Sequence, residues 1–294
     1  MRIYIVRHGR STANDDASEY ADAFGPGQPI PLTRLGMLQA QESGRQFAAA
    51  VASQPGKFNV YCSPFLRARQ TCELFLQSGL EKQKRVAHLY GADELSEIHQ
   101  GDFEGYSKEE DFAAFEKAGA IRHGAEDRPL TEADRQFMAD RRAGKYYRSQ
   151  PPYGMSCESL CEGAQRFIER ERLTEQPQDV ILFTHSFRAI ALAACLTSPD
   201  ADHLEETFDR LAAKRVKNGE ILVVEGDKEH GFTVRQMPGI VIPKSLDDAP
   251  LTAKLASRRN PQHLTDYDAQ KPAAVGELSR RIREQSGKDA HGLG

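Results

Sequence analysis

The sequence predicts an α/β protein, a three-layer αβα sandwich built on a mostly parallel central sheet. Short apolar runs, typical of buried strands, alternate along the chain with longer stretches of helical periodicity. This alternation indicates parallel strands joined by right-handed helical crossovers, with helices on both faces of the sheet. The length of 294 residues suits a doubly wound domain of this kind.

Each element is predicted from its local sequence. Runs rich in β-branched and aromatic residues predict strands near residues 2–7, 57–62, 84–89, 179–184, 220–225 and 231–236. Apolar residues at helical spacing predict core helices near residues 33–52, 65–78, 156–173, 186–196 and 203–213. Further helices are expected at Glu109 to Ala118 and Glu132 to Arg142, and Pro151-Pro152 stops any helix before the core resumes. A polar tail from about residue 241 onward contains one expected late helix, at Ala274 to Gln285.

The composition argues against several classes of protein. A formal net charge of −4 argues against a general nucleic-acid binder, and the lack of a long apolar run argues against a membrane span. Met1 leads directly into the first strand, so we expect no signal peptide. The five cysteines have no framework spacing and predict reduced thiols in the cytoplasm. Cys157 and Cys161 lack further ligands nearby, so we expect neither a metal site nor a cofactor.

Polar side chains gather directly after the first predicted strand, in Arg7-His8-Gly9. Ligands of open α/β sheets bind at the carboxyl ends of parallel strands. A neutral imidazole there is able to attack phosphorus, and an arginine is able to grip phosphoryl oxygens.

Three more segments follow predicted strands in the same way. They run from Ser63 to Thr71, from Glu97 to Gly105, and from Thr184 through His185 to Ser186. Two histidines, two arginines and a glutamate therefore lie at strand ends, far apart in sequence but able to converge in space.

With these motifs the chain resembles the histidine phosphatase superfamily, the phosphoglycerate-mutase-like group. The Arg-His-Gly start, Ser-Pro-x-x-Arg-Ala-x-Gln-Thr, Glu-x-x-x-Gly and a late strand ending in histidine occur in family order, over roughly residues 1–236. Leu32-Thr33 and Gly36 resemble the start of the family's first helix. The resemblance implies a histidine phosphatase domain at 1–240 with a helical cap inserted at about 106–155. Residues 241–294 would then be a partly ordered C-terminal extension.

The resemblance also implies a role for individual residues. His8 matches the phosphorylated nucleophile and Glu97 the proton donor to the leaving oxygen. The remaining matches form or support the phosphate pocket: Arg7, Arg67, His185, Asn14 and Glu158, the last following Cys157 where glycine is usual.

Physical chemistry favours the same assignment. Phosphoryl transfer needs positive charge around three equatorial oxygens, which two guanidiniums and an imidazolium at His185 would supply without a metal. The backbone N–H of Ser186, at the start of a helix, would add a donor for the anion.

Some residues near the motifs depart from the family pattern. Ser186-Phe187-Arg188 replaces a glycine after the second histidine, and Arg188 is a candidate substrate contact. Arg10 stands where relatives carry glutamate or glutamine and would make the pocket mouth more basic. His99 has two interpretations, as a pocket residue near Glu97 or as an ordinary loop histidine.

A basic and aromatic stretch, Arg141 to Arg148, ends the insertion. One hypothesis is that Tyr147 and Arg148 hold the non-phosphoryl part of the substrate and favour one with additional negative charge. The alternative is a solvated helix end with its usual charges.

Three functions remain open on these observations. The first is hydrolysis of a small phosphomonoester. The second is a cofactor-dependent phosphoglycerate mutase, which the sequence disfavours because mutases resemble one another around Glu-Arg-His-Tyr-Gly and Lys-Arg-Ala. This chain has Glu97-Ile98-His99-Gln100-Gly101 and Leu66-Arg67-Ala68 instead. The third is a phosphoprotein phosphatase or an interaction module on the same fold. The expected partner is a small phosphorylated substrate, with no nucleic acid and no membrane. The tail has two interpretations, as a segment that packs on the core or as one that mediates a homodimer.

Overall fold

A six-stranded sheet forms the centre of the molecule, in a computed structural model that describes residues 1–15, 30–81, 83–104, 106, 109–123 and 126–237. The strands are β1 (Arg2–Arg7), β2 (Phe58–Cys62), β3 (Val86–Gly91), β6 (Asp179–Thr184), β7 (Ile221–Asp227) and β8 (Gly231–Gln236). Their order across the sheet is β3-β2-β6-β1-β7-β8. The first four pair in parallel, whereas β7 and β8 add an antiparallel hairpin at one edge.

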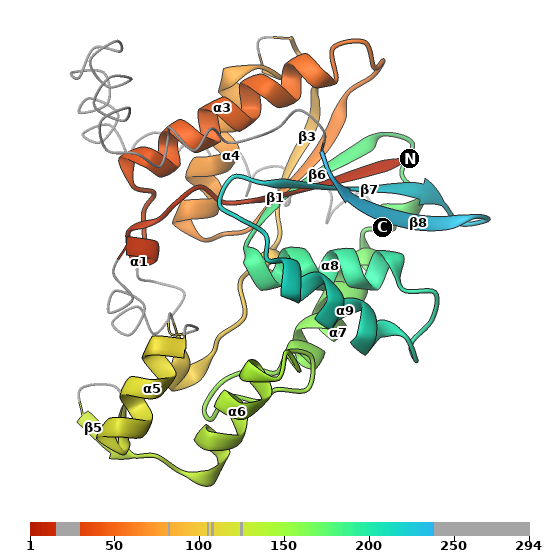
Figure 1. The fold of residues 1–294 in the computed structure, drawn as a ribbon. Helices are drawn as coiled ribbons and strands as arrows, with labels where there is room; N and C mark the ends of the chain where they lie inside the picture. The colour runs from red at the N-terminus through yellow and green to blue at the C-terminus, as the bar shows by residue number, and fades with distance from the viewer. Residues whose placement is uncertain (16–29, 82, 105, 107–108, 124–125, 238–294) are drawn as a thin grey trace, which may run out of the picture.

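Helices cover both faces of this sheet, as Figure 1 shows. One layer contains α3 (Arg34–Ala50) and α4 (Leu66–Ser78). The other contains α7 (Cys157–Arg170), α8 (Ser186–Thr197) and α9 (Leu204–Lys214), and a short α1 (Thr12–Asp15) follows β1. Alternate residues of β1 enter the two cores: Tyr4 and Val6 pack with the first layer, Ile3 and Ile5 with the second. The predicted three-layer α/β sandwich is therefore confirmed.

The strand order decides where the polar motifs meet. The strands β2, β6 and β1 are direct neighbours and run in parallel, so their carboxyl ends share one edge of the sheet. Ser63, His185 and His8 are the residues that follow these three ends.

The cap, as we call residues 106–155, lies beyond this edge of the sheet (Figure 1). It contains α5 (Glu109–Ala118) and α6 (Glu132–Arg142), both as predicted, and a small hairpin of β4 (Ala120–His123) and β5 (Glu126–Pro129). Its core is separate from the two cores of the sandwich and consists of Phe103, Phe112, Ile121, Leu130, Phe137 and Met138. The hairpin is an addition to the helical cap that the sequence predicts, because two four-residue strands with mostly charged or exposed residues give no apolar alternation to detect.

The remaining elements are short 3-10 turns, η1 (Asp93–Leu95), η2 (Gly101–Phe103) and η3 (Leu173–Glu175). The predicted extension at 241–294 and its helix at 274–285 lie outside the described residues. None of the helices in the described ranges is both long and apolar enough to cross a membrane. All five cysteines are free thiols, as predicted.

Candidate active site

His8 is held in one tautomer by its two ring nitrogens. Its Nδ1 lies 2.6 Å from the carbonyl oxygen of Gly9, which only accepts, so Nδ1 must donate the proton. The Nε of Arg67 donates to Nε2 of His8 at 3.3 Å, so Nε2 must be the unprotonated nitrogen. The lone pair of Nε2 is the atom that a nucleophilic role requires.

The charge state of His8 agrees with this tautomer. The side chain is buried, and burial, followed by the guanidiniums of Arg67 and Arg7, lowers the pKa of His8 well below its usual value. The imidazole is therefore neutral at physiological pH. A neutral imidazole between two arginines is suited to attack a phosphoryl group whose negative charge those arginines bind.

Close backbone packing fixes the loop that carries His8. A Cβ atom on Gly9 would lie 2.3 Å from the carbonyl oxygen of Gly36, and one on Gly36 would lie 1.9 Å from that of Arg10. Neither position accepts a side chain, because at both positions the added Cβ atom would clash with a backbone oxygen. The glycine of the Arg-His-Gly start is therefore required to seat the loop against the first turn of α3.

The segment after β2 supports the same loop from the other side. The hydroxyl of Thr71 accepts a hydrogen bond from the Gly9 N–H at 3.0 Å and donates to the carbonyl oxygen of Arg67 at 2.7 Å. The hydroxyl of Ser63 lies 2.9 Å from Nε2 of His185. Thr71 thus positions the loop of His8, and Ser63 orients His185.

His185 lies beside His8, with 5.1 Å between the ring centroids, and is fully buried. Burial, followed by the positive charges of Arg67 and Arg7, lowers the pKa of His185 well below its usual value. In this structure the lowered pKa favours the neutral form of His185, and the imidazolium expected from the sequence stays a prediction for the phosphate-bound site. The guanidiniums of Arg7 and Arg67 supply the fixed positive charge.

A cavity of about 340 Å³ opens between the sheet edge and the cap. This volume suits a small organic molecule. The sequence-predicted residues that line it are Arg7, His8, Asn14, Arg67, Glu97 and Ser186. The structure thus brings together residues from four separate segments of the chain.

Glu97 is fixed at the start of helix α8. Its Oε1 accepts hydrogen bonds from the N–H groups of Ile98 at 3.0 Å and Arg188 at 3.1 Å, and its Oε2 accepts one from Phe187 at 3.2 Å. Two of these donors belong to the first turn of α8, which the glutamate side chain caps. Glu97 therefore keeps a defined position at the cavity wall.

Glu104 is a second cavity carboxyl that our sequence analysis missed. Its Oε2 accepts a hydrogen bond from the Gln100 N–H at 2.7 Å. Burial, opposed by this hydrogen bond and assisted by the charge of Glu97, raises the pKa of Glu104 to about 7. The Phe-Glu-Gly sequence gave no sign of this, because the shift depends on how deeply the side chain is buried.

The raised pKa predicts a pH-dependent stability. The folded state holds the Glu104 proton up to about pH 7, whereas the unfolded chain loses it near pH 4.5. The contribution of Glu104 to stability therefore falls as pH rises from about 4.5 to about 7. We expect Glu104→Gln to raise the free energy of unfolding by on the order of 2 kcal/mol at pH 8 and to change it little at pH 4. Urea unfolding at both pH values measures this, and an equal effect at the two would contradict it.

His8, Arg67 and Ser63 lie within the part of the chain that matches a known protein family. The family model "Histidine phosphatase superfamily (branch 1)" matches residues 3–129. Over these residues the chain resembles the histidine phosphatase superfamily. The fold is similar to that of a putative alpha-ribazole-5'-P phosphatase from Escherichia coli, whose structure superposes with a TM-score of 0.54 at 21% identity, over 82% of this chain and 98% of that one.

Two relatives show how far the likeness extends in sequence. "Phosphoglycerate mutase-like protein AT74H" of Arabidopsis thaliana is 33% identical over 116 residues, 37% of this chain and 39% of that protein. The chain thus spans about two fifths of the length of this relative. "Adenosylcobalamin/alpha-ribazole phosphatase" of Salmonella typhimurium is 26% identical over 202 residues, 68% of this chain and 82% of that protein.

Two of the departures from the histidine phosphatase pattern do not reach the cavity. Arg188 is buried and donates from Nε to the Ser96 carbonyl at 3.0 Å and from Nη1 to the Leu160 carbonyl at 2.7 Å. Arg188 is therefore a structural residue beneath Glu97 and not a substrate contact, which corrects our expectation. Arg10 is also absent from the cavity lining. His99 does not line the cavity either, and its Nδ1 accepts from the Gly101 N–H at 3.3 Å, which favours its interpretation as a loop histidine.

The basic stretch reaches the cavity through different residues from those expected. Tyr147 is buried against Phe208, with 5.8 Å between the ring centroids, and does not line the cavity. Arg148 is 65% exposed and pairs with Glu205 at 2.8 Å and Glu158 at 3.8 Å. Tyr147, Arg148 and Glu158 therefore lie away from the cavity, which corrects three predicted substrate contacts.

Instead, the cap contributes residues to which the sequence analysis assigned no individual role. They are Tyr106, Glu109, Phe112, Phe137, Arg141, Arg142 and Tyr146. Helical spacing was the available signal, because Phe137 and Arg141 are four residues apart and share a face of α6.

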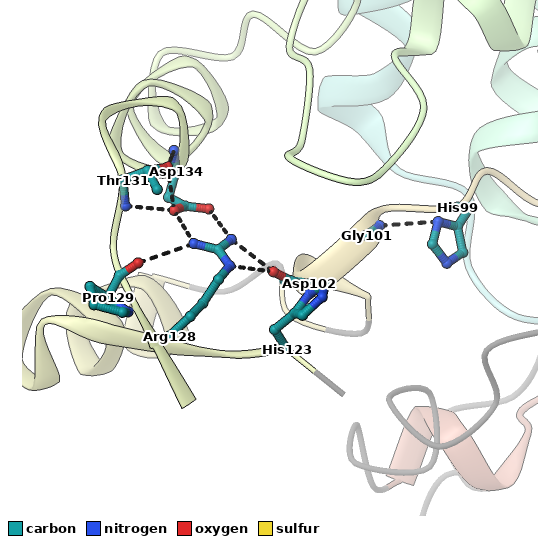
Figure 2. A network of polar contacts seen from close by, with 8 residues as sticks. All are labelled: His99, Gly101, Asp102, His123, Arg128, Pro129, Thr131 and Asp134. Atoms are coloured by element: carbon teal, nitrogen blue, oxygen red, sulfur yellow. Dashed lines mark hydrogen bonds and ion pairs between the residues drawn. The ribbon is translucent and has the colours of Figure 1, made fainter. Parts of the chain in front are cut away.

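A buried polar network holds the cap against the turn that carries Glu104 (Figure 2). Arg128 donates from Nε to Asp102 at 2.8 Å and from Nη1 to Asp134 at 2.6 Å. The side chains of Asp102 and Asp134 are 2% and 0% exposed. His123 adds a contact of 2.8 Å to Asp102, and Asp134 completes a capping box with Thr131 at the start of α6. One guanidinium thus ties η2 to the hairpin and to α6.

No group of three or more His, Cys, Asp or Glu side chains within the described ranges has the geometry to hold a metal ion.

Proposed function

We propose that this protein is a phosphomonoester hydrolase that forms a phosphohistidine at Nε2 of His8, with small phosphorylated molecules as substrates. The observation that carries the proposal is the neutral, tautomer-fixed imidazole of His8 in contact with Arg67 in the cavity. The relationship to a Salmonella protein named as a phosphatase supports it.

In the first step, Nε2 of His8 attacks phosphorus and the bond from phosphorus to the ester oxygen breaks. Arg7 and Arg67 balance the charge on the phosphoryl oxygens, and the leaving oxygen takes a proton from a carboxyl group. Throughout this step Nδ1 keeps its proton and donates it in the hydrogen bond to the Gly9 carbonyl oxygen. This hydrogen bond stabilises the positive charge that the attack places on the imidazole ring.

In the second step, water attacks the phosphohistidine and the bond between nitrogen and phosphorus breaks. The carboxylate that gave its proton in the first step takes one from this water. Two displacements replace one difficult hydrolysis. We assign the carboxyl group to Glu97, because its three backbone donors fix it at the cavity wall.

A pair of variants tests this assignment. Glu97→Gln should lower kcat for an alkyl phosphate by roughly 10²- to 10⁴-fold, and much less for p-nitrophenyl phosphate, whose leaving group needs little protonation. Glu104→Gln, the matched control in the same cavity, should leave the ratio of the two rates as in the wild type. A selective loss in Glu104→Gln would transfer the acid role to Glu104, and equal losses on both substrates in Glu97→Gln would remove it from Glu97.

A substrate panel tests the function itself. The purified chain is assayed with EDTA on small phosphomonoesters, on a phosphoprotein, and on 3-phosphoglycerate with and without 2,3-bisphosphoglycerate. We expect release of inorganic phosphate from small phosphomonoesters without any added metal. Isomerisation that depends on the bisphosphate would favour the mutase, and activity on the phosphoprotein alone would favour the third alternative.

A cytoplasmic location and a homodimer are also part of the proposal. The five free thiols support the location. Light scattering on the full chain tests the dimer.

A further inference from the structure

Arg141 forms no ion pair with a carboxylate in the part of the chain that the structure describes, and Asp209 attracts its charge only from beyond ion-pair distance. It lies in the last turn of α6 and lines the cavity. Its Nη2 donates to the side-chain oxygen of Gln100 at 3.2 Å, which is a neutral acceptor. In contrast, Arg142 pairs with Glu109 and with Glu116, each at 2.8 Å.

Three aromatic rings enclose the guanidinium of Arg141. Its Cζ lies 4.9 Å from the ring centroid of Phe137, 5.1 Å from that of Tyr146 and 4.9 Å from that of Phe187. Such rings attract a cation and hold its plane in place, but they bring no negative charge. All three rings also line the cavity, so the charge is presented within an apolar wall.

The surroundings of Arg141 are unfavourable for a charge. Burial lowers the pKa of Arg141, although the group remains protonated. The nearby thiol of Cys157 supplies no compensation, because burial raises its pKa to about 12 and keeps it neutral. A partly buried guanidinium whose nearby carboxylate, Asp209, forms no ion pair with it loses hydration without full compensation, and an anion entering the cavity would relieve that cost.

The two phosphate-binding arginines belong to a different part of the site. Arg7 ends β1 and Arg67 lies at the start of α4, both at the sheet edge, whereas Arg141 comes from the cap. A single phosphoryl group bound beside His8 is already matched by the first two. The cap cation is therefore suited to a second anionic group at another position on the same substrate.

We propose that Arg141 binds a second anionic group of the substrate. The substrate class is then a phosphomonoester that also carries a carboxylate or a second phosphate next to an apolar or aromatic part. This inference rests on the proposed phosphatase function and specifies its substrate. The apolar part would pack against Phe137, Tyr146 and Phe187, and the flat guanidinium would meet the two oxygens of the anion.

Two synthetic substrates of equal size test the proposal. 4-Carboxyphenyl phosphate carries the second anion, and 4-carbamoylphenyl phosphate replaces it with a neutral amide. We expect the wild type to prefer the carboxylate by about 10- to 100-fold in kcat/KM, the value of a hydrogen-bonded charge pair in a partly buried site. In Arg141→Met the preference should fall to near one, and in Arg141→Lys it should be retained in part. In Arg148→Met, the control on the exposed side of the same stretch, it should be unchanged.

The outcomes separate this inference from the proposed function. A wild type that hydrolyses both esters without preference, or a preference that survives Arg141→Met, would overturn the role of Arg141 alone. A wild type that hydrolyses neither would overturn the proposed function. In that case calorimetry compares the affinity of the protein for 4-carboxybenzylphosphonate with its affinity for benzylphosphonate. Tighter binding of the carboxylate compound by the wild type, lost in Arg141→Met, supports the anion site. Equal binding of the two compounds by the wild type overturns it.

Discussion

His8→Ala is expected to reduce turnover of any phosphomonoester substrate by at least about 10⁴-fold, because loss of a nucleophile removes the whole covalent route. The same change should eliminate a phosphoenzyme that is labile in acid and stable in base. Arg7, Arg67 and the cavity remain in the variant, so it should still bind inorganic phosphate. Stopped assays with ³²P-labelled substrate measure both the rate and the trapped intermediate.

His88→Ala is the matched control, since His88 is exposed on the edge strand β3 and lies outside the cavity. It should turn over like the wild type. A His8→Ala variant that kept more than a few per cent of the activity would show that another residue attacks phosphorus.

Arg128→Met should destabilise the protein by about 3 kcal/mol. The variant leaves the buried carboxylates of Asp102 and Asp134 without their shared cation. Breaking a buried pair in this way costs about 3–5 kcal/mol, and we expect the lower end because Arg128 is 16% exposed and water partly screens the pair. Chemical denaturation followed by circular dichroism measures the change.

Arg142→Met is the comparison for this effect. Arg142 also bridges two acids, Glu109 and Glu116, but all three side chains are at least 33% exposed. Ion pairs of this kind contribute little, so we expect a change below about 1 kcal/mol. Equal losses in the two variants would mean that the network of Figure 2 contributes no more than a surface pair.

The sheet and the catalytic candidates could be predicted because each depends on a short stretch of sequence. Apolar runs mark the strands, and a parallel sheet places residues that follow neighbouring strands at one edge. His8 and His185 meet for this reason, although 177 positions separate them in the sequence. Ile3 and Val180, which pair in the adjacent strands β1 and β6, have the same separation.

The cap contacts could not be predicted because they depend on which side chains are buried together. Within the stretch from Arg141 to Arg148, charge and aromatic content are spread evenly along the sequence. Only the end of α6 and the packing of Tyr147 on Phe208 decide that Arg141 faces the cavity and Arg148 faces solvent. The lowered pKa of His185 could not be predicted for a related reason, since it depends on burial and on neighbours that the sequence does not place.

The separate core of the cap has a consequence for how this protein could be re-engineered. The groups that would break the ester are fixed by backbone contacts such as that of Gly9 with Gly36, which involve no cap residue. Most of the cap packs around its own phenylalanines and Phe103 of η2, and Arg128 ties it to that turn, while Tyr147 and Arg148 join its last residues to α9. Replacing the cap as one unit, with Asp102 and its partner arginine kept, should therefore exchange substrate preference between homologues while the reaction chemistry stays the same.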